Sequence, residues 1–228
     1  GIGWSNLSTP PTPAQAAQDA YALASALKLT PPYLLVGHGY GALISHAFAE
    51  NYPQDTHALL LVEPYLPPAA LRAQVDKRTF KRLFDPNVNM AGAGLLARSG
   101  LARFTPPPYP LPDAQRPHWQ AAQADITIVR TMAAETRLAQ QHAPTWLHED
   151  IPATLEHPLT VVLADVHHSS EHYVKQRLKE DQIRRAVDAR FMLSQRYVNL
   201  SNEGKLEVVM GYPAYLQTKP LVDAVLDL

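Results

Sequence analysis

The chain has 228 residues, which is enough for one domain with a sizeable core. Its formal net charge is -1, so the charge balance does not favour binding to nucleic acid. It has no cysteine, which excludes disulfides, thiolate metal sites and a cysteine nucleophile. No apolar run approaches the roughly 18 residues that a membrane-spanning helix needs, so we expect no transmembrane segment.

The beginning of the first predicted helix is clearly marked in the sequence. Thr12 is a good N-cap, Pro13 stands at the first helical position, and Gln15 completes a capping box. Apolar residues at helical spacing predict the buried face of this helix: Ala16, Ala20, Leu23 and Leu27.

Short apolar runs then alternate with helical patterns along the chain. The runs are typical of strands buried on both faces of a parallel sheet, and they lie at residues 31–37, 57–65, 157–166 and 205–211. The helical patterns between and after them lie at 41–53, 171–198 and 219–228.

The stretch from 67 to 157 differs because it carries helical patterns only, the clearest at 68–84 and 117–142. This order predicts an α/β fold with a parallel sheet. Its core is formed by residues 1–66 and 158–228, and a helical lid is formed by 67–157.

The sequence GHGYG at residues 37–41 joins a strand to a helix. Its spacing is that of a nucleophile elbow, in which the middle residue presents the reactive side chain. Here that residue is Gly39, which has no side chain and cannot attack a carbonyl carbon. The elbow residue is strained by about 1–3 kcal/mol when it is not glycine, so glycine preserves the turn while removing the chemistry.

On these segments the chain resembles the α/β-hydrolase superfamily of serine esterases and lipases. Residues 1–5, GIGWS, look like the loop after the family's fourth strand, and 31–53 resemble its fifth strand, elbow and following helix. Residues 57–65 and 158–165 are similar to strands six and seven, and 200–228 to the last strand, histidine loop and final helix. The resemblance implies a hydrolase-type sheet with strands five to eight visible here, a helical lid and no cofactor.

The resemblance also places a catalytic triad on this sequence. The nucleophile falls on Gly39, the acid on Asp165 with Glu63 as the alternative, and the histidine on Tyr212 or Pro213. No histidine lies between Arg177 and Leu228, so at most one carboxylate of the triad remains. The resemblance therefore implies a degenerate member that lacks both nucleophile and histidine.

A further implication is that the sheet is unfinished in this sequence. One oxyanion donor would be the N–H of Tyr40, and the other would come from a loop after the third strand, which lies upstream of residue 1. The strand at residues 33–36, from Tyr33 to Val36, would then be an apolar edge. We expect strands one to four either upstream in the same polypeptide or in a partner chain that covers this edge. Because the sequence begins with Gly1, we expect a processed chain or a fragment, with an organelle such as the mitochondrion as its location.

Other chemistry-bearing features have a simpler interpretation. A histidine-rich stretch would fit a metal site, but an exposed polar loop entering a helix is preferred: His167, His168, Glu171 and His172. His38, beside the elbow, is predicted to pack. The basic residues of 72–82 are predicted to form a solvated helix face, with binding to anionic lipid as the alternative. Four aromatic residues are predicted to pack in the lid or core: Phe104, Trp119, Trp146 and Phe191.

These residues leave three hypotheses for function. The favoured one is a catalytically inactive hydrolase-fold protein that serves as a structural or accessory subunit of a larger assembly. The second is a serine hydrolase of carboxylesterase or lipase type, represented by an inactivated variant. The third is a binding module that keeps a cleft between lid and sheet for an apolar ligand.

Overall fold

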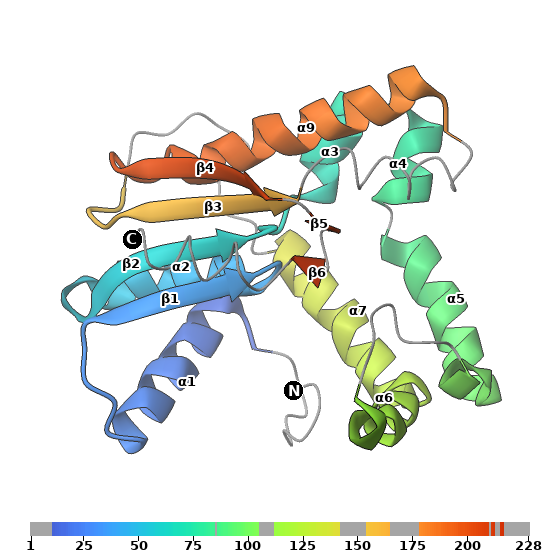
Figure 1. The fold of residues 1–228 in the computed structure, drawn as a ribbon, viewed down its shortest axis with the longest axis horizontal. Helices are drawn as coiled ribbons and strands as arrows, with labels where there is room; N and C mark the ends of the chain where they lie inside the picture. Colours follow the sequence, from blue (N-terminus) through green and yellow to red (C-terminus); the bar gives the residue numbers. More distant parts are fainter. Residues whose placement is uncertain are drawn as a thin grey trace.

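A four-stranded parallel sheet, in the order β1-β2-β3-β4, forms the centre of the computed structural model (Figure 1). The structure describes residues 11–84, 86–104, 112–141, 154–164, 178–209, 211–212 and 215–216, and only the backbone at 86–91, 93, 211–212 and 215–216. The strands are β1 (Tyr33–His38), β2 (Thr56–Val62), β3 (Leu159–Ala164) and β4 (Gly204–Val209). All four predicted strands and the predicted fold class are confirmed.

Burial explains why these apolar runs form the middle of the sheet. Every residue of β3 is buried, and β2 is buried at all positions except His57. Strands covered on both faces must be apolar throughout, which is why the two runs show no alternation. The parallel register pairs Leu59 with Leu159 and Val161 with Leu206, which aligns the carboxyl ends of the strands at one edge.

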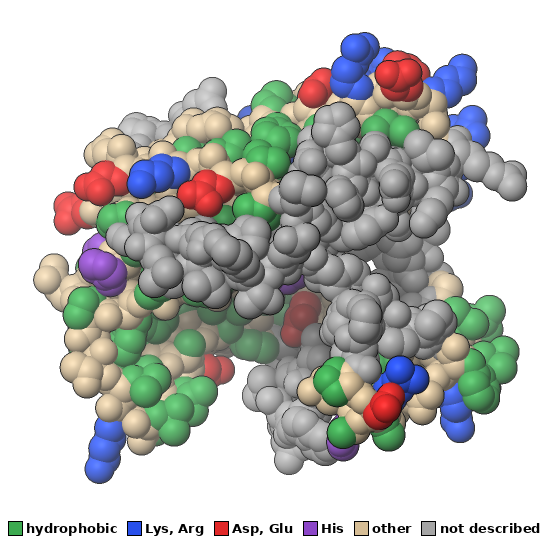
Figure 2. Space-filling view, in the orientation of Figure 1, with side chains coloured by type: hydrophobic (Ala, Val, Ile, Leu, Met, Phe, Trp, Pro, Cys, Tyr) green, Lys and Arg blue, Asp and Glu red, His purple; other side chains and the backbone are tan. Residues whose placement is uncertain are grey.

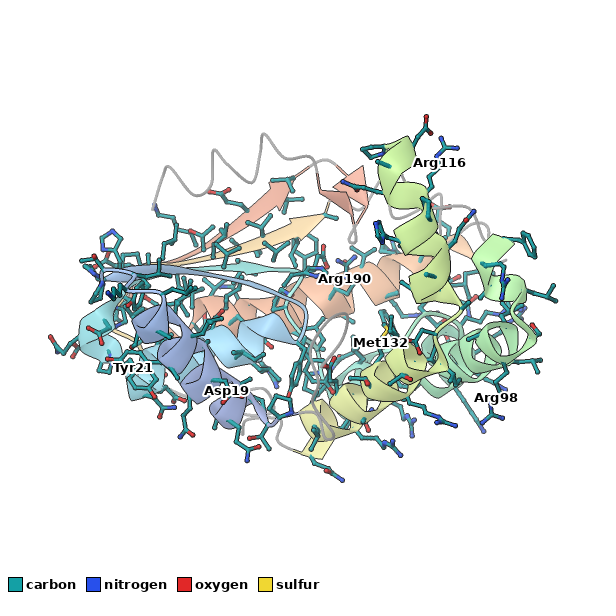
Figure 3. All side chains as sticks on the ribbon, turned by 90° about the horizontal axis from the view of Figure 1, so that it is seen from below. Asp19, Tyr21, Arg98, Arg116, Met132 and Arg190 are labelled. Carbon is teal, nitrogen blue, oxygen red and sulfur yellow. The ribbon has the colours of Figure 1, made fainter. Side chains whose placement is uncertain are left out.

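Three helices lie on one face of this sheet: α1 (Pro13–Ala26), α2 (Gly41–Asn51) and α9 (Glu180–Val198) (Figure 3). A short 3-10 turn, η1 (Pro53–Asp55), follows α2 at the predicted Pro53 stop. The main core lies between the sheet and these helices. Its largest fully buried side chains include Leu43, Leu59, Leu159, Leu163 and Tyr197.

Helix α1 begins as predicted, with Thr12 accepting from the Gln15 N–H and the Gln15 side chain accepting from the Thr12 N–H. Its predicted buried face is wrong. The residues that pack are Pro13 and Ala17, whereas Leu23 and Leu27 are 60% and 62% exposed and Ala20 is exposed. The reason is position: α1 packs against α2 and extends past β1, so only a narrow face of it is covered (Figures 1 and 3).

Leu155 forms an isolated parallel β-bridge with Ser201 shortly before β3. The described elements between β2 and that bridge, at residues 68–141, are all helical and are here called the helical insert. They are α3 (Pro68–Gln74), α4 (Lys77–Leu83), α5 (Pro86–Ser99), η2 (Leu101–Phe104), η3 (Asp113–Gln115), α6 (Arg116–Gln123) and α7 (Ile126–Gln141).

Two predicted long helices are each split in the insert. The Asp76 carboxylate accepts from the N–H groups of Arg78 and Thr79 at 3.0 Å, so α4 restarts with its own N-cap. The Asp125 carboxylate accepts from the Thr127 N–H at 2.7 Å just before α7. Aspartate competes for backbone N–H groups in this way, which periodicity alone does not reveal.

The carboxyl-terminal part is described only partly. A two-stranded antiparallel pair, β5 (Gly211–Tyr212) and β6 (Tyr215–Leu216), follows β4. The predicted helix over 171–198 is described from residue 178 and begins at Glu180, and the predicted helix over 219–228 lies outside the described residues. Across the described residues, no helix has the length and apolar character needed to span a bilayer.

Candidate functional site

The elbow follows β1 at the carboxyl edge of the sheet and leads into α2. Gly39 has a φ of 56°, the left-handed conformation that glycine adopts without strain. Its N–H donates to the Val62 carbonyl at 3.1 Å, and its carbonyl accepts from the N–H groups of Ala42 and Tyr65, both at 3.1 Å. The turn is therefore held by β2, by the start of α2 and by the segment after β2.

Two glycines of the motif have opposite surroundings. A Cβ on Gly37 would lie 2.5 Å from the Gly41 carbonyl oxygen and 2.6 Å from Ser45 Oγ, so only glycine fits there. A Cβ on Gly39 would meet nothing within 4 Å. The start of α2 thus approaches Gly37 closely, whereas a Cβ on Gly41 would also meet nothing within 4 Å. Position 39 has room for a side chain and carries none.

Tyr40 connects the elbow to the helical insert. Its hydroxyl donates to the Pro11 carbonyl at 3.1 Å. Burial raises the pKa of Tyr40 to about 12, and the carboxylate of Glu135, on α7, adds to the rise. Burial also raises the pKa of Glu135 above its ordinary value. Ala139 of α7 belongs to the buried cluster against which Tyr40 packs, which places this part of α7 near the elbow.

Glu63, the alternative triad acid, directly follows β2 and has a positive φ of 44°. One carboxylate oxygen accepts from the Ala164 N–H at 2.5 Å, and the other pairs with the Arg190 guanidinium of α9. The side chains of Glu63 and Arg190 are only 12% and 10% exposed. Because both oxygens already have partners, Glu63 ties β2 to β3 and α9 and is poorly suited to orient an imidazole.

Tyr197 of α9 adds a second support to the same segment. This fully buried residue donates its hydroxyl to the Tyr65 carbonyl at 2.5 Å, and the Tyr65 N–H in turn holds the Gly39 carbonyl. Arg190 and Tyr197 thus hold residues 63–65, and those residues hold the elbow. Sequence reasoning missed this support, although Glu-Pro-Tyr directly after a buried strand is an unusual polar signal.

Several predicted site residues fall where the structure describes little. Asp165, Pro213 and the histidine-rich stretch at 167–172 lie outside the described residues, and Tyr212 is described only as backbone in β5. Within the described residues, no group of three His, Cys, Asp or Glu side chains is arranged to hold a metal ion. His38, predicted to pack, is exposed at the end of β1, where Val36 is also exposed and only Gly37 between them is buried.

Solved structures share the fold of this chain. A mutant of a Pseudomonas aeruginosa protein assigned as an epoxide hydrolase matches with a TM-score of 0.60 and 14% identity, covering 95% of this chain and 71% of that one. A Nostoc sp. PCC 7120 protein assigned as an α/β hydrolase matches with a TM-score of 0.59 and 13% identity, covering 97% and 75%. The chain has the α/β-hydrolase fold.

An esterase from Rhodococcus sp. ECU1013 has the same fold, with a TM-score of 0.52 and 15% identity over 99% of this chain and 76% of the esterase. No family model matches the sequence, and no curated protein matches it. At such identities the hydrolase fold is shared, while activity has to be argued from the residues of the site.

Proposed function

We propose that residues 37–41 are the nucleophile elbow of a serine-hydrolase type site, and that this site is catalytically silent in the chain as its sequence stands. The observation that carries the proposal is Gly39. Its backbone has the left-handed turn of an elbow, its side-chain direction is open, and it has no nucleophilic atom. Acyl transfer by this mechanism requires a hydroxyl at that position and a base to deprotonate it.

The remaining triad positions support the same view. Asp165 and Tyr212 are proposed as vestigial positions of the acid and the histidine, and the Tyr40 N–H as a vestigial oxyanion donor. The sequence has no histidine between Arg177 and Leu228 that could serve as the base. We also propose that residues 67–157 form a lid over the core made by 1–66 and 158–228, which the packing of Ala139 and Tyr40 in one buried cluster supports.

For the biological role, we propose a structural or accessory subunit whose partner strand covers β1. The Gly39 N–H points to β2, so alternation directs the backbone groups of Leu34, Val36 and His38 to the outer edge. No described strand pairs with that edge, and Val36 is 59% exposed. Leu23 of α1 and Leu27 just after it are exposed as well, which leaves further apolar surface for a partner.

The second candidate is a serine hydrolase of carboxylesterase or lipase type, represented here by an inactivated variant. The room beside Gly39 and the esterase of the same fold favour it. These comparisons support a hydrolase better than they support an accessory role, for which the argument rests on missing groups and an open edge.

The Gly39→Ser variant separates the two candidates. We expect it to hydrolyse short p-nitrophenyl esters no faster than the unchanged chain, because the sequence has no histidine at the position proposed for the general base. Gly39→Ala is the matched control, since it adds a Cβ at the same backbone position without a hydroxyl. Turnover by Gly39→Ser alone, together with labelling of that serine by a fluorophosphonate, would establish the serine hydrolase and overturn the silent site.

A further inference from the structure

The ten residues 95–104, at the junction of α5 and η2 in the helical insert, are here called the tip. In the tip, small residues are buried and large apolar residues are exposed, the reverse of the usual pattern. Its small residues are buried, with Ala97 4% exposed and Ala102 6% exposed. Its large apolar residues are exposed: Leu95 72%, Leu96 45%, Leu101 56% and Phe104 75%. The prediction that Phe104 packs is therefore wrong. A helix end that only needed to be soluble would show the opposite arrangement.

The tip is held in shape by its own hydrogen bonds. Gly100 turns the chain between α5 and η2 with a φ of 71°. The Arg103 Nε donates to the Gly100 carbonyl at 2.9 Å, and Ser99 Oγ accepts from the Leu101 N–H at 3.3 Å. The exposed leucines and Phe104 are thus presented by an ordered turn.

The tip forms a projecting corner of the molecule. Helix α5 runs away from the sheet (Figure 1), and hydrophobic side chains gather with basic ones at the corner farthest from the strands (Figure 2). Figure 3 shows Arg98 at this outer end of the insert. A protruding apolar surface of this kind is suited to entering a soft layer, whereas a protein partner would need a matching hollow.

The charged residues within the tip itself are both basic. The sequence contains no Asp or Glu between Asp85 and Asp113, while Arg98 and Arg103 lie within the tip and are exposed. Arg116, beyond the tip, is paired with Asp113 at 3.2 Å, so the two charges offset each other. Guanidinium groups beside apolar side chains complement a surface that carries phosphates above hydrocarbon.

We infer that the tip is a membrane-contact surface that binds an anionic lipid bilayer. Leu95, Leu101 and Phe104 enter the boundary between headgroups and acyl chains, and Arg98 and Arg103 pair with lipid phosphates. This contact is peripheral, involves no membrane-spanning segment, and does not depend on whether the elbow is silent. It lies in the insert but outside the basic stretch 72–82 that the sequence suggested for lipid binding.

Vesicle flotation with the full chain tests this inference. We expect binding to phosphatidylcholine vesicles with about 30% phosphatidylglycerol and weaker binding to pure phosphatidylcholine. The Leu101→Ser/Phe104→Ser variant should lower the partition coefficient about tenfold or more. Arg98→Gln/Arg103→Gln should remove the preference for anionic vesicles and most of the salt sensitivity.

The matched control is Leu23→Ser/Leu27→Ser on α1, whose leucines are 60% and 62% exposed on a different element. It should bind vesicles like the unchanged chain. Equal loss in the control would show general hydrophobic adhesion, and failure of the unchanged chain to float with either vesicle would show that the tip contacts something other than lipid. Either result overturns the inference.

A labelling experiment avoids dependence on a variant that loses affinity. Because the chain has no cysteine, Phe104→Cys and Leu23→Cys can each carry one polarity-sensitive fluorophore. We expect a blue shift on anionic vesicles for the label at 104 and none for the label at 23. A shift at 23 without one at 104 would place the contact elsewhere, and circular dichroism of both variants checks their folding.

Discussion

At the scale of single residues, the elbow shows two different uses of glycine. Gly37 is required by space, because the start of α2 approaches its Cα too closely for any side chain. Gly39 is favoured by conformation, since its φ of 56° strains other residues while the space around it is open. The first glycine serves the fold under either candidate function, and the second is where the two candidates differ.

Gly37→Ala is expected to destabilise the chain by about 2 kcal/mol or more, because the new methyl group would force α2 away from β1. The free energy of unfolding, measured by urea titration, checks this. Gly41→Ala is the control, since a Cβ there meets nothing within 4 Å and alanine favours the first turn of a helix. Equal stabilities of the two variants would contradict the close approach.

His46 and Glu50 give a residue-scale prediction for pH. His46 Nδ1 lies 3.3 Å from the Glu50 carboxylate on α2, and this hydrogen bond lowers the pKa of Glu50 below its ordinary value of 4.5, partly opposed by burial. A carboxyl whose pKa is lowered by folding stabilises the protein above its unfolded pKa and loses that contribution as the pH falls through the folded pKa.

We therefore expect Glu50→Gln to reduce stability near neutral pH by less than about 1 kcal/mol, since Glu50 is half exposed. The difference from the unchanged chain should shrink below the ordinary pKa of Glu50 and vanish once the pH falls below its lowered folded-state pKa. Urea titrations across the acid range measure it. A difference that persists at the acid end would mean that the interaction does not depend on the carboxylate charge.

At the scale of elements, α9 supports the elbow indirectly, through the segment that follows β2. Arg190 binds Glu63 and Tyr197 binds the Tyr65 carbonyl, so two side chains two turns apart on one helix fix the segment after β2. The positive φ of Glu63 is maintained by these contacts. The arrangement also joins β3, through the Ala164 N–H, to the same carboxylate.

Arg190→Met is expected to reduce stability by about 3–5 kcal/mol, because it leaves the Glu63 carboxylate buried without its cation. Adding Glu63→Gln should restore much of the loss. Arg185→Met is a control on the same helix: it removes an exposed pair with Asp181 at 2.6 Å and should change stability by less than about 0.5 kcal/mol. Similar losses for Arg190→Met and Arg185→Met in denaturant titrations would refute a buried role for the Glu63 pair.

At the scale of the whole molecule, the open edge of β1 and the leucines of α1 lie on one side, and the projecting tip of the insert lies on another. Exposed edges with apolar side chains pair readily with other strands. The first surface fits a strand and the second fits a bilayer. The molecule would accordingly have two separate binding surfaces around a silent elbow.

We expect the isolated chain to self-associate with rising concentration through β1, and Val36→Lys to reduce that association. Light scattering and sedimentation velocity measure it. Val208→Lys is the control on β4, the other outer strand, where Val208 is 47% exposed. The β1 edge is not the surface of self-association if the unchanged chain remains monomeric at high concentration. The same holds if both lysine variants reduce association equally.

Much of the architecture was predictable because its signals are local. Uninterrupted apolar runs such as that of β3 need burial on both faces, and the Thr12 capping box marks a helix start within four residues. The breaks at Asp76 and Asp125 were missed because an aspartate in a helical pattern can face solvent or cap, and only the path of the chain decides which.

The candidate site likewise has some features that local sequence predicts and others that depend on tertiary contacts. The sequence by itself determined that Gly39 has no nucleophile and that the elbow belongs between a strand and a helix, since both follow from residue type and spacing. Only the tertiary structure decided that Glu63 is held by Arg190, that Leu23 and Leu27 are exposed, and that Leu95 and Phe104 point outward. Those facts depend on which distant segments come together in the fold. The periodicity of side chains predicts that one face of an element is apolar, but it does not predict which segment packs against that face.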